Sequence, residues 1–338
     1  MKKGVLLINL GTPDSPKVSD VRKYLTQFLN DPRVIDINPL GRFLLVNGVI
    51  VPFRAAKSAK LYEKIWTKEG SPLLVHSKNL SSKLQEALGE EYHVELGMRY
   101  QSPSINSALG KLQAANVDSI VVIPLYPQYA TSSTTSSLEE VQKVLKKWVG
   151  HPEVKIIQNF FDDAGFIEAL VEKAKKYDLT KYDHFIFSYH GLPERHITKT
   201  SKEFGDGSCK IGSCCDVITD KNRLCYRANC YATTRSIVKA LNIPEGKYIS
   251  SFQSRLDDKW LKPYSDRVVE ERAKAGDKNV LVFSPAFVSD CLETIYEIGI
   301  EYDEIFKEHG GEKITLVESL NDSPEWIEAL KSMVLKAK

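Results

Sequence analysis

The sequence lacks three features that would place it in a simple class. Its 46 Lys and Arg residues and 44 Asp and Glu residues leave a formal charge of only +2, so no strong field attracts a nucleic-acid backbone. No apolar run reaches the roughly 18 residues of a membrane-spanning helix, and the nearest candidate, 43–53, is interrupted by Asn47 and Pro52. The apolar stretch 5–10 leads into Gly11 rather than a signal-peptide cleavage site. We therefore expect a cytoplasmic protein that does not bind nucleic acid.

Cysteine is also unevenly distributed. Of the six cysteines, five lie in the order Cys209-x4-Cys214-Cys215-x9-Cys225-x4-Cys230, whereas a secreted scaffold would spread its disulfide pairs along the chain. Thiolates at such short separations can surround a soft inorganic centre, either a tetrahedral zinc ion or an iron–sulfur cluster. Five free thiols are the remaining alternative. The spacing predicts a metal or cluster site.

Short apolar runs alternate with amphipathic stretches, a pattern typical of parallel α/β sheets flanked by helices. The 338 residues suggest about two domains at roughly 150 residues each. About four strands fall on each side of residue 140, so we expect one α/β domain over 1–140 and another over 141–323, with a last helix in 324–338 that can pack back on the first. The expected strands are 5–10, 94–98, 119–123, 154–158, 184–189, 248–252, 279–283 and 314–317, and the expected helices include 18–29, 80–88, 138–148, 166–176, 232–241 and 293–308.

One histidine follows directly from a buried strand. Residues 184–190 form an apolar run that delivers His190 to its carboxyl end, and Gly191 and Pro193 then turn the chain. Ligands of open α/β sheets bind outside these carboxyl ends. Because neutral imidazole accepts protons near pH 7 and binds divalent transition metals, His190 is a candidate catalytic or metal-binding residue. The alternative is a histidine that only packs in the core.

Three glutamates, Glu293, Glu297 and Glu301, are spaced four residues apart after the strand 279–283. In an α-helix they would share one face and repel each other by a few tenths of a kcal/mol per pair. This pattern predicts either a solvated acidic face or a carboxylate track that conducts a cation, with Asp290 and Cys291 at its entrance.

Polar and aromatic residues also gather at strand ends in the first half, notably Arg99, Tyr100 and Tyr126. No GxGxxG phosphate loop accompanies them, so nicotinamide binding is weakly supported. They suit a flat, anionic, partly apolar ligand, although ordinary packing explains them equally well. The hydroxyl run 131–137 suggests a solvated loop or a ligand lining, and a capping box of Ser137 and Glu140 predicts where the next helix begins.

Five ordered motifs together resemble the ferrochelatase family, which inserts ferrous iron into a porphyrin. They are Asn9-Leu-Gly11, Pro124-Leu-Tyr-Pro-Gln128-Tyr, Ser188-Tyr-His190-Gly-Leu-Pro193, Ser251-Phe-Gln253-Ser and Ser289-Asp-Cys-Leu-Glu293-Thr. The resemblance implies a chelatase-like fold of two Rossmann-like domains with a cleft between them. It also implies a lyase that converts protoporphyrin IX and Fe2+ to protohaem and two protons.

The resemblance assigns roles to single residues. His190 would be the principal proton acceptor and an early iron contact, and Glu293 its partner in proton removal or metal delivery. The expected metal path consists of Glu297, Glu301 and Asp290, and the expected contacts to the porphyrin ring or its propionates are Arg99, Tyr100, Tyr126, Gln253 and Trp260. Residues 43–53 resemble an apolar lip of the cleft that can rest on a membrane.

The cysteine-rich loop 201–230 departs from the simplest family members. It resembles an internal segment with which some microbial ferrochelatases bind a [2Fe-2S] cluster, and this implies Cys209, Cys225 and Cys230 as ligands with Cys214 or Cys215 as the fourth. Cys291 stands where animal relatives place a histidine. The expected partners are a porphyrin and ferrous iron, in a monomer or homodimer.

Two alternatives stay open at this point. A chelatase could instead act on coproporphyrin III or another tetrapyrrole, which a substrate competition would distinguish. A bilobal haem- or metal-binding protein, from a different functional class, would bind its ligand tightly without catalysing metal insertion.

Overall fold

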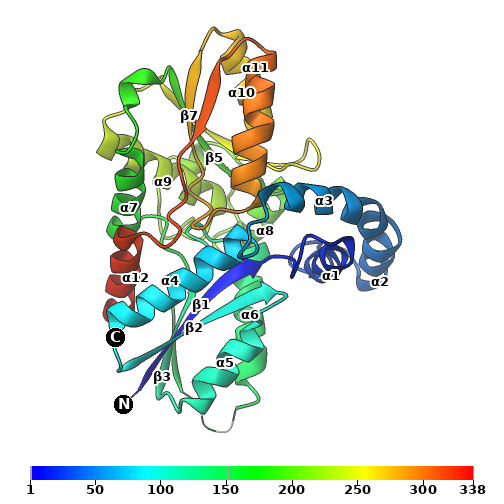
Figure 1. Cartoon of the computed structure of the whole chain (residues 1–338), viewed down its shortest axis with the longest axis vertical. Helices are drawn as coiled ribbons and strands as arrows, with labels where there is room; N and C mark the ends of the chain where they lie inside the picture. Colours follow the sequence, from blue (N-terminus) through cyan, green and yellow to red (C-terminus); the bar gives the residue numbers. More distant parts are fainter. Residues whose placement is uncertain (1, 149, 151, 338) are drawn as a thin grey trace. The chain divides into compact units, whose positions relative to one another are not determined.

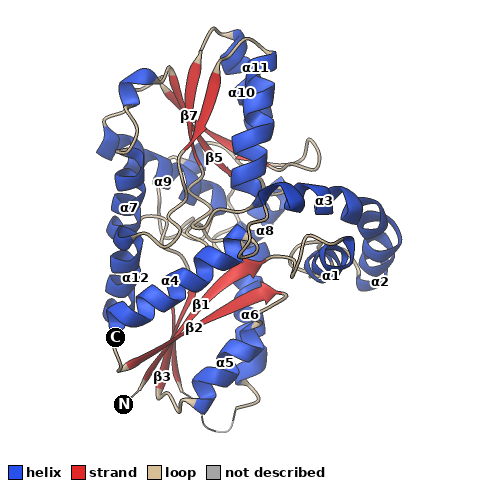
Figure 2. Cartoon of the chain, viewed as in Figure 1, coloured by secondary structure: helices blue, strands red, loops and turns tan. Residues whose placement is uncertain are grey.

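The computed structural model describes residues 2–148, 150 and 152–337. The chain folds into two compact units. The first comprises Met1–Tyr126, Thr131–Gln158 and Asn321–Lys338, and the second comprises Pro127–Ala130 and Asn159–Leu320. Each unit holds one four-stranded sheet covered by helices (Figure 2). The first unit thus extends past residue 140 to residue 158, and it also includes the C-terminal helix of the chain.

The first sheet has the strand order β2-β1-β3-β4, and all of its pairs are parallel. Its strands are β1 (Lys3–Gly11), β2 (Tyr92–Tyr100), β3 (Ser119–Pro124) and β4 (Glu153–Ile156). Helices α5 (Ile105–Ala114) and α6 (Ser136–Leu145) cover one face, where Leu6 and Ile8 of β1 enter their core. Helix α4 (Pro72–Leu88) covers the other face, and α12 (Pro324–Lys336) packs on α4 (Figure 1).

Between β1 and α4 the chain forms a group of helices: α1 (Val18–Leu29), α2 (Pro39–Leu44), the π-helix η1 (Leu45–Ile50) and α3 (Val51–Ile65). The apolar run 43–53 is therefore helical throughout. Pro52 does not interrupt it: Pro52 stands in the first turn of α3, directly after the wider turns of the π-helix η1. Among the described residues, no helix is long and apolar enough to cross a membrane.

The second sheet repeats the order of the first as β6-β5-β7-β8, again with parallel pairs. Its strands are β5 (His184–His190), β6 (Tyr248–Gln253), β7 (Asn279–Phe283) and β8 (Lys313–Leu316). One face packs against α10 (Ser265–Lys274), the π-helix η5 (Leu292–Tyr302) and α11 (Asp303–Glu308). The chain also forms α7 (Ala164–Ala174), η3 (Leu179–Lys181), α8 (Glu194–Phe204), η4 (Ser213–Cys215) and α9 (Tyr226–Leu241) in this unit.

The shared strand order identifies one corresponding point in each sheet. The first strand of each unit lies between the next two strands in sequence, so the chain order reverses at that strand. Ligands of open α/β sheets bind in the crevice at such a switch point. Gly11 and His190 end the two central strands and occupy these points. The prediction of two parallel α/β sheets is confirmed.

Two local predictions are wrong. The hydroxyl run 131–137 is not a solvated loop but a π-helix, η2 (Thr131–Thr135), that continues into α6, with Ser136 and Ser137 buried. Ser137 therefore lies inside the helix and does not cap it. The helix expected over 293–308 is present, but its first part is the π-helix η5 and only α11 is α-helical, so the expected α-helical alignment of the three glutamates is wrong. Since π-helices bond i to i+5, residues four apart are not aligned as in an α-helix.

Candidate functional site

The His190 side chain is held in one tautomer. Its Nδ1 lies 2.7 Å from the carbonyl oxygen of Gly191. A carbonyl can only accept, so Nδ1 carries the proton and Nε2 of the neutral ring is an unprotonated acceptor. Nε2 has no hydrogen-bond partner among the described residues. The end of β5 therefore presents a proton acceptor and metal ligand that the fold itself has not used.

The turn after His190 depends on a glycine. A Cβ on Gly191 would lie 2.7 Å from the backbone oxygen of Gln253 and 3.2 Å from the Trp260 ring. The Trp260 and Phe287 rings lie 6.5 Å and 6.2 Å from the imidazole, measured between centroids. These rings give the imidazole apolar neighbours, which limit its access to water.

Gln253 connects the strand that ends in His190 to the π-helix that begins near Glu293. It pairs with His190 across β5 and β6, and its side-chain Oε1 accepts a hydrogen bond of 2.8 Å from Ser188. Its Nε2 donates to the backbone oxygen of Glu293 at 2.9 Å and to Glu297 Oε2 at 3.0 Å. One buried amide thus fixes the position of η5 relative to the end of β5.

The Glu297 carboxylate is fully occupied by donors. Besides Gln253, it accepts hydrogen bonds from the Ser254 N–H at 2.8 Å, the Ser254 hydroxyl at 2.6 Å and the Tyr302 hydroxyl at 3.0 Å. Burial raises the pKa of Tyr302, and the neighbouring Glu297 charge raises it further, so this phenol stays a donor. Four hydrogen bonds hold the carboxylate in place.

The other acidic residues predicted along the metal path lie in different surroundings. Glu293 is half-buried, whereas Glu301 is exposed. Asp290 is buried and accepts hydrogen bonds from Thr294 at 3.1 Å and from the Ser319 N–H at 3.4 Å. Cys291 is also buried, and burial raises the pKa of its thiol. The three glutamates therefore do not form one uniform acidic face.

In the first unit, two predicted porphyrin contacts belong to a buried polar network. Asp31 accepts hydrogen bonds from Arg99 Nη2 at 2.5 Å, the Tyr100 hydroxyl at 2.9 Å and the Ser136 hydroxyl at 2.6 Å. Arg99 Nε also donates to the Ser136 hydroxyl at 2.6 Å. Burial and the Asp31 charge raise the pKa of Tyr100. Sequence reasoning missed Asp31, because nothing local marks an acid whose partners are about 70 and 100 residues away.

Tyr126, the third predicted contact in this unit, lies at the end of β3. Its hydroxyl is 3.3 Å from that of Ser137, and burial raises its pKa. The hydroxyl run thus does provide polar groups near these candidates, from the start of α6. Arg99, Tyr100 and Tyr126 lie in the first unit, whereas His190, Gln253, Glu293 and Trp260 lie in the second.

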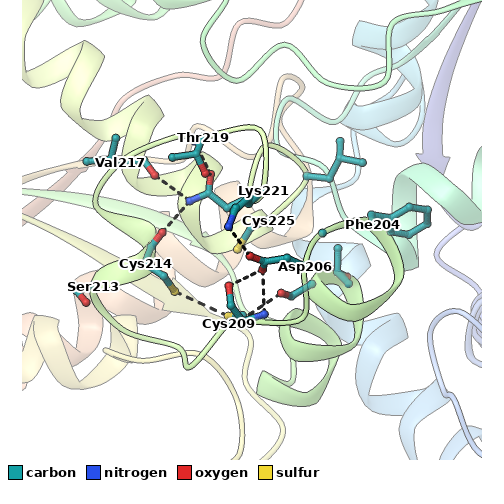
Figure 3. Close-up of a pocket in the computed structure, with 15 residues that line it drawn as sticks. Phe204, Asp206, Cys209, Ser213, Cys214, Val217, Thr219, Lys221 and Cys225 are labelled. Atoms are coloured by element: carbon teal, nitrogen blue, oxygen red, sulfur yellow. Dashed lines mark hydrogen bonds and ion pairs between the residues drawn. The ribbon is translucent and has the colours of Figure 1, made fainter.

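The cysteine-rich loop encloses a cavity of about 290 Å³ that Cys209, Cys214 and Cys225 help to line (Figure 3). The sulfurs of Cys209 and Cys214 are 3.9 Å apart, and those of Cys214 and Cys215 are 4.0 Å apart. Two thiolates on one tetrahedral metal, with metal–sulfur bonds of about 2.3 Å, would stand roughly 3.8 Å apart. These separations fit thiolates that share an iron or zinc centre.

One of these thiols is electrostatically activated. A hydrogen bond from Cys225 and the neighbouring Arg227 lower the pKa of Cys215 to about 6, although its burial opposes this shift. Cys230, in contrast, is fully buried in α9 and does not line the cavity, and burial raises the pKa of its thiol. Within the described ranges, no set of three or more His, Cys, Asp and Glu side chains is already arranged around a metal position.

Comparison with known families and sequences gives one consistent result. The family model described as ferrochelatase matches residues 2–338. A ferrochelatase of Coxiella burnetii (strain Dugway 5J108-111) is 46% identical over 339 residues, covering 99% of this chain and 94% of that protein. A ferrochelatase of Legionella pneumophila (strain Lens) is 45% identical over 335 residues, covering 99% of both.

Solved structures with a similar fold are also chelatases. SirB from Bacillus subtilis with Fe3+ superposes with a TM-score of 0.55 at 11% identity, covering 100% of this chain and 96% of that one. The sirohydrochlorin chelatase SirB from Bacillus subtilis subspecies spizizenii, in complex with cobalt, gives 0.56 at 10% identity, with coverage of 100% and 95%. At these identities the similarity establishes the fold alone.

Proposed function

The chain belongs to the ferrochelatase family, and we propose that its chemistry depends on His190 and Glu293. As a porphyrin ferrochelatase it inserts Fe2+ into protoporphyrin for haem biosynthesis. The observation that carries the assignment is the unpartnered Nε2 of His190 at the switch point of the second sheet. Metal insertion must remove two pyrrole N–H protons and replace the water ligands of the iron. Both requirements call for a neutral base that can also bind a metal.

His190 meets these requirements through its tautomer. Because Nδ1–H is held by Gly191, Nε2 can accept a pyrrole proton or contact the iron without a change of tautomer. On accepting a proton the ring becomes positively charged, and the proposed role of the half-buried Glu293 carboxylate is to stabilise this charge or to take the proton on. The hydrogen bond from Gln253 to the Glu293 backbone oxygen supports this role, because it ties the start of η5 to β6, the strand beside β5.

For Glu297 we propose a positioning role rather than a place on the metal path. A carboxylate with four hydrogen bonds must lose several of them before it can bind a hydrated cation, and each hydrogen bond to a charged group contributes about 1.5–3 kcal/mol. Asp290 and Glu301 stay candidates for the path.

An anaerobic metalation assay tests the function. Purified protein is mixed with ferrous iron and either protoporphyrin IX or coproporphyrin III, and the haem absorption spectrum is followed. We expect faster turnover with protoporphyrin, and faster turnover with coproporphyrin would assign the alternative substrate. Tight binding of porphyrin or iron without metalation would contradict the enzyme assignment and favour a binding protein.

Variants separate the carboxylates in the same assay. Glu293→Gln should lower kcat by about 10²–10⁴-fold, the usual contribution of a proton-transfer group. Glu304→Gln, which is exposed on the following helix α11, is the control and should stay within about twofold. For Glu297→Gln we expect a lower melting temperature. A loss of kcat in Glu297→Gln equal to that in Glu293→Gln, at unchanged stability, would restore the path assignment for Glu297.

We also propose that the cysteine loop holds a [2Fe-2S] cluster through Cys209, Cys214, Cys215 and Cys225. The sulfur separations near 4 Å support this set. Cys215 does not line the cavity either, but it is kept because its sulfur lies 4.0 Å from that of Cys214. Cys230 is left out because its thiol is fully buried within α9 and interacts with the Tyr226 hydroxyl. When bound, the cluster would supply a one-electron redox centre and a cross-link of the loop.

The test of the cluster uses protein purified without oxygen. We expect sulfur-to-iron charge-transfer absorption and about two irons per chain. Cys209→Ser and Cys225→Ser should lose both signals, and Cys230→Ser should keep them. Stoichiometric zinc without visible colour would contradict the cluster.

Finally, we propose that the segment 37–53 makes a peripheral contact with a membrane. Large apolar side chains are exposed there on α2, η1 and α3, with Leu40 at 69% and Phe53 at 81%. Co-sedimentation with phospholipid vesicles tests this. Leu40→Ser combined with Phe53→Ser should abolish binding, whereas Leu256→Ser, which is 75% exposed in the second unit, should not change it. A cytoplasmic location and a monomer or homodimer stay predictions.

A further inference from the structure

The His190 backbone is bound by a residue of the cysteine-rich region. The Tyr226 hydroxyl donates a hydrogen bond of 2.7 Å to the His190 carbonyl oxygen. Tyr226 is buried, and burial raises its pKa, so the phenol is a permanent donor. It therefore fixes the last peptide of β5, from which the imidazole projects.

Tyr226 is also the first residue of α9, and Cys225 is the residue that caps this helix. The Cys225 N–H donates to the Asn222 carbonyl at 2.8 Å. The Asn222 side chain in turn donates to the carbonyl oxygens of Cys214 at 2.7 Å and Val217 at 2.8 Å. A continuous series of hydrogen bonds, together with the peptide bond between Cys225 and Tyr226, thus connects Cys214 to His190.

A second contact ties the same helix start to the loop. Arg227 donates to the Gly212 carbonyl at 3.2 Å, and the Asn229 side chain donates to the Arg223 carbonyl at 3.0 Å. The first turn of α9 is therefore hydrogen-bonded to both sides of the segment that contains Cys214 and Cys215. A change in the loop must move Tyr226 or break one of these bonds.

We propose that Tyr226 is a positioning residue that aligns His190 and transmits the state of the cysteine loop to it. The inference rests on the proposed roles of His190 and of the cysteines. When the loop is ordered around its ligand set, Tyr226 holds the His190 carbonyl. When the thiols are released, the first turn of α9 loosens and the imidazole loses its alignment. Such coupling is established only by measured non-additivity, not by proximity.

A double-mutant cycle provides that measurement, with kcat and KM determined for wild type, Tyr226→Phe, Cys225→Ser and the double variant. Loss of one hydrogen bond corresponds to roughly a 3- to 10-fold fall in kcat. We expect this fall in each single variant, with KM changed by less than about twofold. In the Tyr226→Phe background, Cys225→Ser should have almost no further effect. Additive losses, or no loss from Cys225→Ser in the wild-type background, would overturn the coupling.

One control matches Tyr226→Phe in type and location. Tyr231→Phe removes a phenol hydroxyl from the same helix, one that accepts a bond from Arg227 and does not contact His190. It should keep kcat within about twofold, and circular dichroism should show that all variants are folded. A tenfold loss in Tyr231→Phe would mean that α9 is generally sensitive, which overturns a specific role for Tyr226.

A spectroscopic measurement is independent of turnover. In protein labelled with ¹⁵N-histidine, the His190 ring nitrogens should report the Nδ1–H tautomer, and Tyr226→Phe should broaden or shift these signals while Tyr231→Phe leaves them unchanged. Unchanged His190 signals in Tyr226→Phe would overturn the positioning role. If wild type has no metalation activity, the proposed function fails, yet these spectra still decide whether Tyr226 positions His190.

Discussion

The two sheets share one strand order, yet their central strands end in different ways. At the end of β1, Asn9 donates to Ser77 at 3.1 Å, and Gly11 adopts a φ of +110° beside the backbone of Tyr100. At the end of β5, His190 keeps Nε2 without a partner among the described residues. The polar groups at the end of β1 are used in internal contacts, whereas the end of β5 presents a reactive imidazole nitrogen. Strand order therefore locates the candidate sites, and only the residues decide which of them carries chemistry.

The strongest test of this comparison replaces a histidine in each sheet. His190→Ala removes the proposed proton acceptor, so kcat for porphyrin metalation should fall by about 10²–10⁴-fold. His93→Ala, on β2 of the first sheet, should stay within about twofold. Haem formation is measured anaerobically for both. Equal activity of the two variants would refute the assignment of the chemistry to the second sheet.

Gly11→Ala tests whether the close contact between the end of β1 and the Tyr100 backbone stabilises the first unit. A Cβ there would lie 1.9 Å from the Tyr100 carbonyl oxygen and would require an unfavourable positive φ. Together these effects should lower the free energy of unfolding by about 3–5 kcal/mol. Gly70→Ala has a φ of +126° but no atom within 4 Å, so it should cost only about 1–2 kcal/mol. Urea titration compares the two, and equal losses would show that the contact with Tyr100 does not matter.

Asp31→Asn tests the internal use of Arg99 and Tyr100. The change leaves the Arg99 guanidinium beside a neutral amide in a largely buried network, which should cost about 3 kcal/mol of unfolding free energy. Amide hydrogen exchange should show the loss in the first unit and not in the β5 region. An unchanged stability with a raised KM for porphyrin would instead support direct contact of Arg99 with the substrate.

The smallest expected effect concerns the other end of the central strands. β1 begins at the exposed Lys3, whereas β5 begins at the buried His184, where burial lowers the pKa to about 4. The unfolded chain, with a pKa of about 6.5, binds the proton first as the pH falls. Above pH 6.5, His184 therefore has little effect on stability. Between pH 7.5 and pH 5 it should lower the free energy of unfolding by about 2 kcal/mol. His184→Gln should show a correspondingly weaker pH dependence in urea titrations, and parallel curves would exclude this role.

Most strands could be predicted from the sequence because they are short, largely apolar runs, although β4 is only partly buried. His190 could be predicted because one such run delivers it to a sheet edge. The network around Asp31 could not, since its partners come from distant segments and no local pattern specifies them. The π-helical geometry of η5 could not be predicted from the sequence either. Glutamates spaced four residues apart are compatible with either an α-helix or a π-helix. The hydrogen bonds to Glu297 come from Gln253 and Ser254, at the end of β6, about 40 residues earlier in the chain.

The hydrogen bonds to Glu297 have a consequence for the direction of neighbouring side chains. A π-helical segment is normally less favourable than the α-helical alternative, and it persists where surrounding contacts hold it. If the Glu297 carboxylate were released, η5 could rewind to tighter turns. Every side chain on the rewound turns would then rotate around the helix axis, and the direction of the Glu293 side chain would change with the hydrogen bonds of a residue four positions along the chain.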